Sequence, residues 1–167
     1  MQNRKETIKD FNNILEEFID KMILQFPTEK KLKSYRSAYR VSKNLDKTMP
    51  INIVMSSLMH FKDQIRDKDE DFFRNSKTFV NKAVRASSFS NDLGLVNYWD
   101  SLSDNSKTAI WEYVQTLFIL GETYINNDPL AISNINNISN NLTFNESIDV
   151  IEKNNTYTEE FINKINK

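Results

Sequence analysis

The amino-acid sequence predicts an all-α fold, an irregular single-domain bundle of six to eight helices. Apolar residues in the hydrophobic segments recur at steps of three and four, the period of a helix with one buried face. The 167 residues contain only two glycines, and no useful length alternates between apolar and polar residues as a half-buried strand would. A chain of this length is typical of one domain and buries roughly 70% of its unfolded surface.

Two helices are expected before residue 46. The first spans residues 6–25 and ends before Pro27, because the residue preceding a proline disfavours the α conformation. Thr28 is predicted to cap the second helix, which runs to about Leu45. The apolar side of this second helix consists of Leu32, Tyr35, Ala38, Tyr39 and Leu45.

A third helix is expected to open at residues 48–50, since a proline is well tolerated in a first turn. Its apolar residues keep helical spacing as far as Ile65, so we predict one continuous helix to that point. Shorter helices are expected near residues 79–84 and over residues 92–102.

The clearest helix of the second half is predicted from Lys107 to about Ile125, with Ser106 as its cap. Gly121 lies among its apolar positions, where the missing side chain lets another helix approach closely. Trp111 of this helix and Trp99 before it share helical spacing with leucine and valine, and we interpret both tryptophans as core residues.

The composition changes after residue 127, and 12 of the last 42 residues are asparagine. Asparagine is a poor helix former, so packing against the rest of the chain would have to stabilise helices there. We therefore divide the chain into a helical core domain, residues 1–127, and an Asn-rich segment, residues 128–167. The second part is expected to form short helices packed on the core.

The composition excludes several classes of site. Without cysteine there are no disulfides, thiolate zinc sites or cysteine nucleophiles. One histidine and two glycines exclude an all-histidine metal cage within one chain and a glycine-rich phosphate loop. We expect no enzymatic activity and no cofactor, although a carboxylate-only hydrolase or a metal-dependent nuclease would leave no such motif. The polar start and the lack of an 18-residue apolar stretch predict an intracellular protein without a membrane span.

An acidic run resembles the start of a calcium-binding loop. Asp67, Asp69 and Asp71 alternate like the first ligands of an EF-hand. Phe72 stands where that loop needs glycine, and Thr78 stands where it needs a bidentate glutamate. We interpret the run as a solvated linker rather than a metal site.

Two other groups of ionisable residues are weak candidates. His60 and Asp63 form an ordinary i, i+3 pair, with no nucleophile motif beside them. Glu16, Glu17 and Asp20 share one side of the first helix, but no Glu-x-x-His motif accompanies them. We interpret the histidine as structural and the three acids as a solvated face.

The second helix carries the most informative pattern, a stripe of basic residues over roughly 25 Å. Lys30, Lys33, Arg40 and Lys47 recur at helical steps, and Lys31, Arg36 and Lys43 broaden the stripe. Three interpretations stay open: a solvated outer face, a surface for an acidic protein, or a track for a phosphate backbone. The whole-chain pI of about 5.9 argues against a dedicated nucleic-acid binder. The candidate partner-binding residues are Lys30, Lys33, Arg36, Arg40, Lys43 and Lys47.

Charge is also uneven along the chain. Residues 1–85 carry 18 basic and 12 acidic side chains, whereas residues 86–167 carry 4 and 11. Either the two halves attract each other within one fold, or the basic half presents a surface to a partner.

Two stretches together carry a resemblance to a known group of proteins. Residues 69–73 read DEDFF, and residues 98–122 contain a tryptophan turn that leads into a helix of the type I-W-x-Y-x-Q-x-L. The tandem resembles short, mostly uncharacterised helical proteins of nucleocytoplasmic large DNA viruses, the giant viruses included. The resemblance implies a viral protein in the host cytoplasm or the virion, and it brings no catalytic residues.

These observations predict a non-enzymatic viral interaction or structural protein. It would bind another protein in a virion or in a viral replication or expression complex. The alternative is a nucleic-acid-binding module that uses the basic helix Lys30–Lys47.

Overall fold

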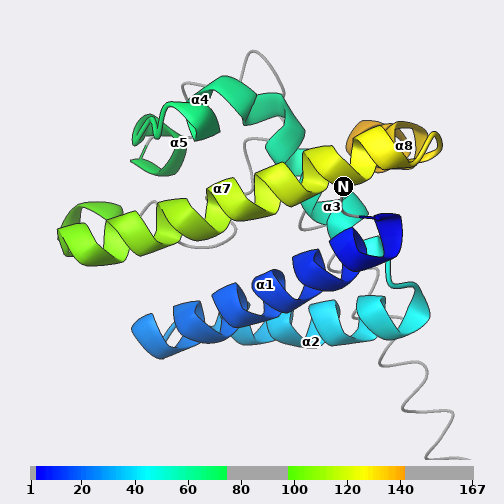
Figure 1. Ribbon diagram of the computed structural model, residues 1–167. Helices are drawn as coiled ribbons and strands as arrows, with labels where there is room; N and C mark the ends of the chain where they lie inside the picture. Colours follow the sequence, from blue (N-terminus) through cyan, green and yellow to red (C-terminus); the bar gives the residue numbers. More distant parts are fainter. Residues whose placement is uncertain (1–2, 75–97, 142–167) are drawn as a thin grey trace, which may run out of the picture.

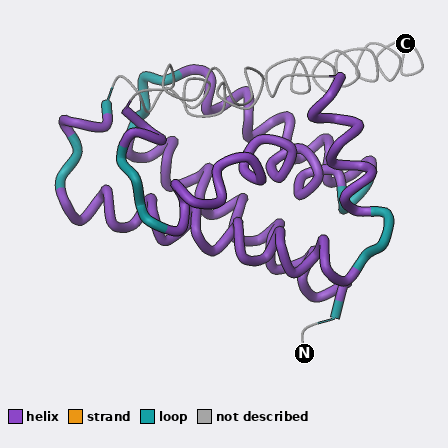
Figure 2. The backbone as a smooth tube through the Cα atoms, turned by 90° about the horizontal axis from the view of Figure 1, so that it is seen from above, coloured by secondary structure: helices purple, strands orange, loops and turns teal. Residues whose placement is uncertain are grey.

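The computed structural model describes residues 3–74 and 98–141. Every element of regular secondary structure in these residues is a helix, which confirms the all-α class. Figure 2 shows the helices from above, joined by short loops. None of the described helices combines the length and the apolar character that crossing a bilayer requires.

Three long helices form the layers of the bundle: α1 (Arg4–Gln25), α2 (Lys30–Leu45) and α7 (Asp104–Asn127). Helix α1 lies between the other two and contacts both (Figure 1). Because α1 and α2 run in opposite directions, the start of α1 lies beside the end of α2. The apolar side of α1 is buried, and its buried residues include Ile8, Phe11, Leu15, Phe18, Ile19 and Met22.

The starts of α1 and α2 differ from the prediction. The Asn3 side chain accepts a hydrogen bond from the Glu6 backbone N–H at 2.9 Å, so α1 begins two residues earlier than expected. The prediction that Thr28 caps α2 is wrong. Glu29 occupies the cap position with extended backbone and no side-chain cap bond, and the helix begins at Lys30.

The start of α7 is a second correction to the predicted caps. Ser103, not Ser106, is the cap residue, and its hydroxyl oxygen accepts the Ser106 backbone N–H at 3.2 Å. Ser103 has the extended backbone that a cap needs, whereas Ser106 already lies in the first turn of the helix. The helix therefore begins at Asp104, three residues before the expected Lys107.

The predicted third helix is interrupted. It consists of α3 (Met49–Leu58), a 3-10 turn η1 (Met59–Phe61) and α4 (Lys62–Arg66). The backbone at Phe61 leaves the helical region, with φ −119° and ψ 29°, and α4 then packs against α7. The change of direction lets both Phe61 and Ile65 reach the core, where each is buried. Helical spacing persists across the break, so the sequence pattern did not show it.

A cluster of aromatic side chains fills one end of the core. Helix α5 (Asp71–Arg74) supplies Phe73, whose ring stacks on Trp99 with centroids 4.4 Å apart. Trp111 of α7 meets Phe73 edge-on with centroids 4.7 Å apart. Both tryptophans are buried, which confirms that they are core residues.

The middle of the chain is described only in part. The helix expected over residues 92–102 is described from Tyr98 onward, where a 3-10 helix η4 (Trp99–Ser101) precedes α7. Its remaining residues lie outside the described part of the chain, as does the helix expected near residues 79–84.

Gly121 lets α7 approach α3 closely, as predicted. A Cβ atom at this position would lie 2.7 Å from both Cγ and Cε of Met55, a fully buried residue of α3. Such a distance is too short for two carbon atoms, so only glycine fits without a shift of the methionine.

The beginning of the Asn-rich segment belongs to the same core. Helix α8 (Ala131–Asn141) packs mainly on α3, and Ala131 and Ile135 are fully buried. The Arg4 guanidinium joins Asp128, just before α8, with Nε and Oδ2 2.7 Å apart. Residues 142–167 of the Asn-rich segment lie outside the described residues.

Candidate partner-binding face

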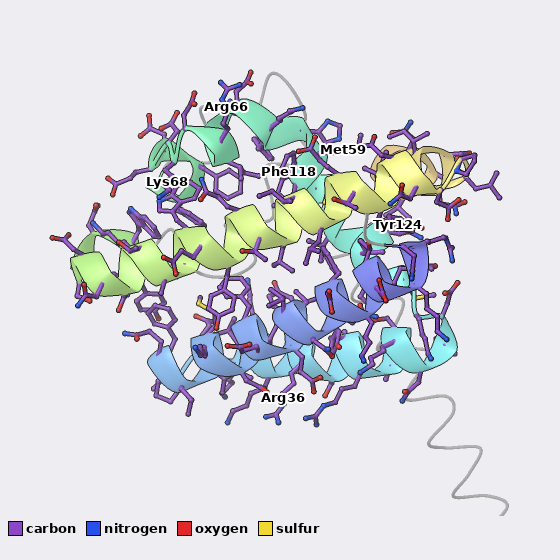
Figure 3. The ribbon with its side chains drawn as sticks, viewed as in Figure 1. Arg36, Met59, Arg66, Lys68, Phe118 and Tyr124 are labelled. Atoms are coloured by element: carbon purple, nitrogen blue, oxygen red, sulfur yellow. The ribbon has the colours of Figure 1, made fainter. Side chains whose placement is uncertain are left out.

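The basic side chains of α2 lie on its outer side because its apolar side packs against α1 and α3. We call the six predicted residues the basic face: Lys30, Lys33, Arg36, Arg40, Lys43 and Lys47. Figure 3 shows Arg36 on this outer side. Five of the six belong to α2 itself. Lys47 lies in the turn after the helix, because α2 ends at Leu45.

Two members of the basic face have partners within the molecule. Arg36 forms an ion pair with Asp20 of α1, with Nε and Oδ1 3.2 Å apart. The Lys43 ammonium lies over the ring of Tyr39, 5.7 Å from its centroid, in a cation–π contact. Of these two contacts, only the Arg36–Asp20 pair joins α2 to another helix, because Lys43 and Tyr39 both belong to α2.

The other four members have no acidic partner among the described residues. Lys30, Lys33, Arg40 and Lys47 are exposed, and none of them forms an ion pair in residues 3–74 and 98–141.

Tyr39 lies beneath the basic face and joins α2 to α1. Its hydroxyl donates to the backbone carbonyl of Asn12 at 2.9 Å. Burial, together with the nearby charge of Glu16, raises the pKa of Tyr39 to about 12. Tyr35 is buried as well, so neither tyrosine is available to stack on a nucleic-acid base.

Sequence reasoning missed three cations that the fold brings beside the end of the basic face. Arg4, Lys5 and Lys9 lie in the first turns of α1 and share a groove with Lys43 and Lys47. The separation of these residues by more than 30 positions hides the cluster in the sequence. The i, i+4 spacing of Lys5 and Lys9 on the polar side of the first helix was the available signal.

The acidic run before α5 is held by local contacts. Arg66 hydrogen-bonds Asp67 and lowers the pKa of that carboxyl group. The Asp69 side chain accepts the Asp71 backbone N–H at 3.0 Å, which forms a turn. The described residues hold no group of three or more histidine, cysteine, aspartate or glutamate side chains placed to bind a metal ion.

The remaining ionisable candidates are dispersed. Partial burial lowers the pKa of the His60 imidazole on η1, and the neighbouring Asp63 pairs with Arg66. Glu17 accepts a hydrogen bond from the Tyr113 hydroxyl at 2.6 Å, whereas Asp20 faces α2. The acids of α1 thus serve contacts with two different helices.

Comparisons of this chain with models of protein families, with curated proteins and with solved structures gave no match.

Proposed function

We propose that this protein is a non-enzymatic interaction protein whose basic face binds an acidic segment of another protein. One observation carries the proposal: four exposed cations on α2 and in the turn after it, Lys30, Lys33, Arg40 and Lys47, lack an acidic partner among the described residues. Clustered like charges steer an oppositely charged partner and set the orientation in which it docks.

An acidic protein suits this surface better than a nucleic acid does. Tyr35 and Tyr39 are buried and offer no stacking platform, and the pI of about 5.9 disfavours general attraction to phosphates. The resemblance to proteins of giant viruses is the basis for placing this binding in a virion or in a viral replication or expression complex. Nucleic-acid binding through the same helix is the competing outcome.

The test is the double reversal Lys33→Glu/Arg40→Glu. Both side chains are exposed, so the free energy of unfolding should change by no more than about 0.5 kcal/mol. Fluorescence anisotropy with a labelled deca-glutamate peptide at low salt should show binding to the unmodified protein. The double reversal should weaken it about tenfold, since two attractive contacts become repulsive.

Lys68→Glu is the matched control. Lys68 is an exposed lysine near α5, on the opposite side of the molecule from α2 (Figure 3), and its reversal should leave peptide binding unchanged. A 20-nucleotide oligothymidylate tests the rival partner. Tighter binding to it than to the peptide, with affinity falling linearly and steeply on a log–log salt plot, would overturn the proposal in favour of a nucleic acid. Equal effects of the two reversals would show that the basic face is only solvated.

A further inference from the structure

A groove of about 810 Å³ lies where the start of α1, the turn between α2 and α3, and the start of α8 meet. Its volume falls within the range, about 300–1000 Å³, of pockets that hold small ligands. The antiparallel course of α1 and α2 places the start of α1 beside the end of α2 (Figure 1), and residues from both line the groove. It continues the basic face, since Lys43 and Lys47 belong to both.

The groove is positively charged where a ligand would enter. Five cations line it against two acids, Asp46 and Asp128. Asp128 is paired with Arg4, and the Asp46 carboxylate accepts both the backbone N–H and the hydroxyl of Thr48 at 2.8 Å. The two acids are thus committed to contacts within the fold.

Three of the five cations that line the groove have no acidic partner among the described residues. Lys5, Lys9 and Lys47 are exposed, and none forms an ion pair within the described residues. The groove therefore presents at least three available ammonium groups to an anionic ligand.

Hydrogen bonds connect the walls of the groove to each other. The Asn12 side-chain amide donates to the Lys47 carbonyl at 3.0 Å and so ties α1 to the turn after α2. Across the opening, the Arg4–Asp128 pair joins α1 to the segment before α8, where the Leu130 N–H donates to Asp128 at 3.0 Å. Such cross-links hold the walls in place before a ligand arrives, which lowers the entropy cost of binding.

One wall also offers an apolar contact. Leu130, at the residue before α8, keeps 68% of its surface exposed although it lines the groove, and Ile8 lies buried in the same lining. A ligand made only of charged groups would leave this leucine in water. Apolar surface beside free cations fits a ligand that carries both carboxylates and an aliphatic group.

We infer that this groove receives an acidic peptide segment in which an aliphatic side chain packs on Leu130 while flanking carboxylates contact Lys5, Lys9 and Lys47. The inference rests on the proposed function, because it specifies the acidic partner further: the partner's acidic segment carries an aliphatic side chain that the groove at the end of the basic face recognises. The rest of the basic face would attract any acidic segment, and the groove would distinguish among them.

Two labelled pentapeptides of equal charge test this inference by anisotropy with the full chain. Each has four glutamates, around a central leucine in one and a central glycine in the other. The leucine peptide should bind about fivefold more tightly, because partial burial of one aliphatic side chain supplies that difference. Leu130→Ser should abolish the preference and leave the affinity for the glycine peptide unchanged.

The reversal Lys5→Glu/Lys9→Glu should weaken binding of both peptides about tenfold. Neither this double reversal nor Leu130→Ser should unfold the chain. Acidic residues are favourable in the first turns of a helix, and serine is favourable at the position before a helix. Thermal unfolding followed by circular dichroism checks this for each variant.

The variants separate failure of the inference from failure of the proposed function. If Lys33→Glu/Arg40→Glu weakens binding while Leu130→Ser and the Lys5/Lys9 reversal do not, the basic face binds and the groove inference is wrong. If only the groove variants matter, the groove binds without the basic face. Equal affinity for the two peptides, or tighter binding of a five-nucleotide oligothymidylate in the groove, would also overturn the inference.

Discussion

Tyr39 shows how one residue joins the core to the candidate surface. Its ring supports the Lys43 ammonium on the outside of α2, and its hydroxyl reaches the Asn12 carbonyl of α1 on the inside. Asn12 in turn contacts Lys47 through its side chain. The position of two basic-face residues therefore depends on a buried tyrosine.

Tyr39→Phe should lower the free energy of unfolding by about 1 kcal/mol, because the hydrogen bond from the tyrosine hydroxyl to the Asn12 carbonyl is lost. The pKa of Tyr39 is about 12 in the folded chain and about 10 when unfolded, so the neutral hydroxyl is favoured by folding. Its contribution to stability is complete below pH 10 and is lost as the pH rises through 12. Urea unfolding should show that the free energy of unfolding falls less between pH 8 and pH 11 for Tyr39→Phe than for the unmodified protein. Equal losses would contradict this role.

The close packing of α3 against α7 depends on Met55 of α3 and on the lack of a side chain at Gly121 of α7. Met55 occupies the space that a Cβ on Gly121 would fill. Residues 50–58 of α3 are buried on every side, by α1, α2, α7 and α8. The methionine therefore has little room to move, and a larger residue at position 121 must strain the interface.

Gly121→Ala should destabilise the protein by about 1 kcal/mol or more, even though alanine favours a helix by about that amount over glycine. Thermal unfolding of a double-mutant cycle with Met55→Ala measures the cause. Met55→Ala alone should cost about 2–5 kcal/mol, and in that background Gly121→Ala should become neutral or stabilising. Additive effects of the two substitutions would show that the methionine is not the obstacle.

At the scale of the whole molecule, part of the uneven charge is used within the fold, which was one of the two uses predicted from the sequence. Arg4 pairs with Asp128 and Lys62 pairs with Glu122, so cations of the basic half contact acids of the acidic half. The exposed cations of the basic face have no such partner among the described residues. Part of the asymmetry therefore forms contacts between the two halves, and the four exposed cations of the basic face are not part of those contacts.

Arg4→Gln tests the pair that joins the start of α1 to the start of α8. Arg4 hydrogen-bonds Asp128 and lowers the pKa of that carboxyl group below its usual 3.8. The stabilisation is therefore present above pH 4 and lost as the pH falls through the folded pKa. Arg4 is half exposed, so the free energy of unfolding of the variant should be lower by about 1 kcal/mol or less at pH 6. Near pH 2 it should equal that of the unmodified protein, and urea unfolding at the two pH values measures both. Lys62→Gln breaks the more exposed Lys62–Glu122 pair, so it should lower the free energy of unfolding less than Arg4→Gln does. A larger decrease for Lys62→Gln would contradict the role given to the Arg4–Asp128 pair.

The sequence by itself determined the helical class, the buried side of α1, the outward position of the basic residues and most of the buried side of α2. The prediction for Leu45 was wrong: it is the last residue of α2 and 62% of its surface is exposed. The correctly predicted features follow from the period of 3.6 residues per turn, which fixes the relative direction of nearby side chains without any tertiary contact. The same local logic predicted the end of α1 before Pro27 and the burial of Trp99 and Trp111.

Tertiary structure alone decided what depends on neighbours distant in the chain. The break at residues 59–61 leaves the apolar spacing intact, and packing against α7 sets its geometry. Polar residues of α3 such as Ser56 are buried, and no amphipathic pattern in the sequence indicates this. The Ser56 hydroxyl donates to the Ile53 carbonyl at 2.6 Å. The groove between α1, α2 and α8 exists only once the helices pack, because its cations come from segments whose separation in sequence carries no information about distance in space.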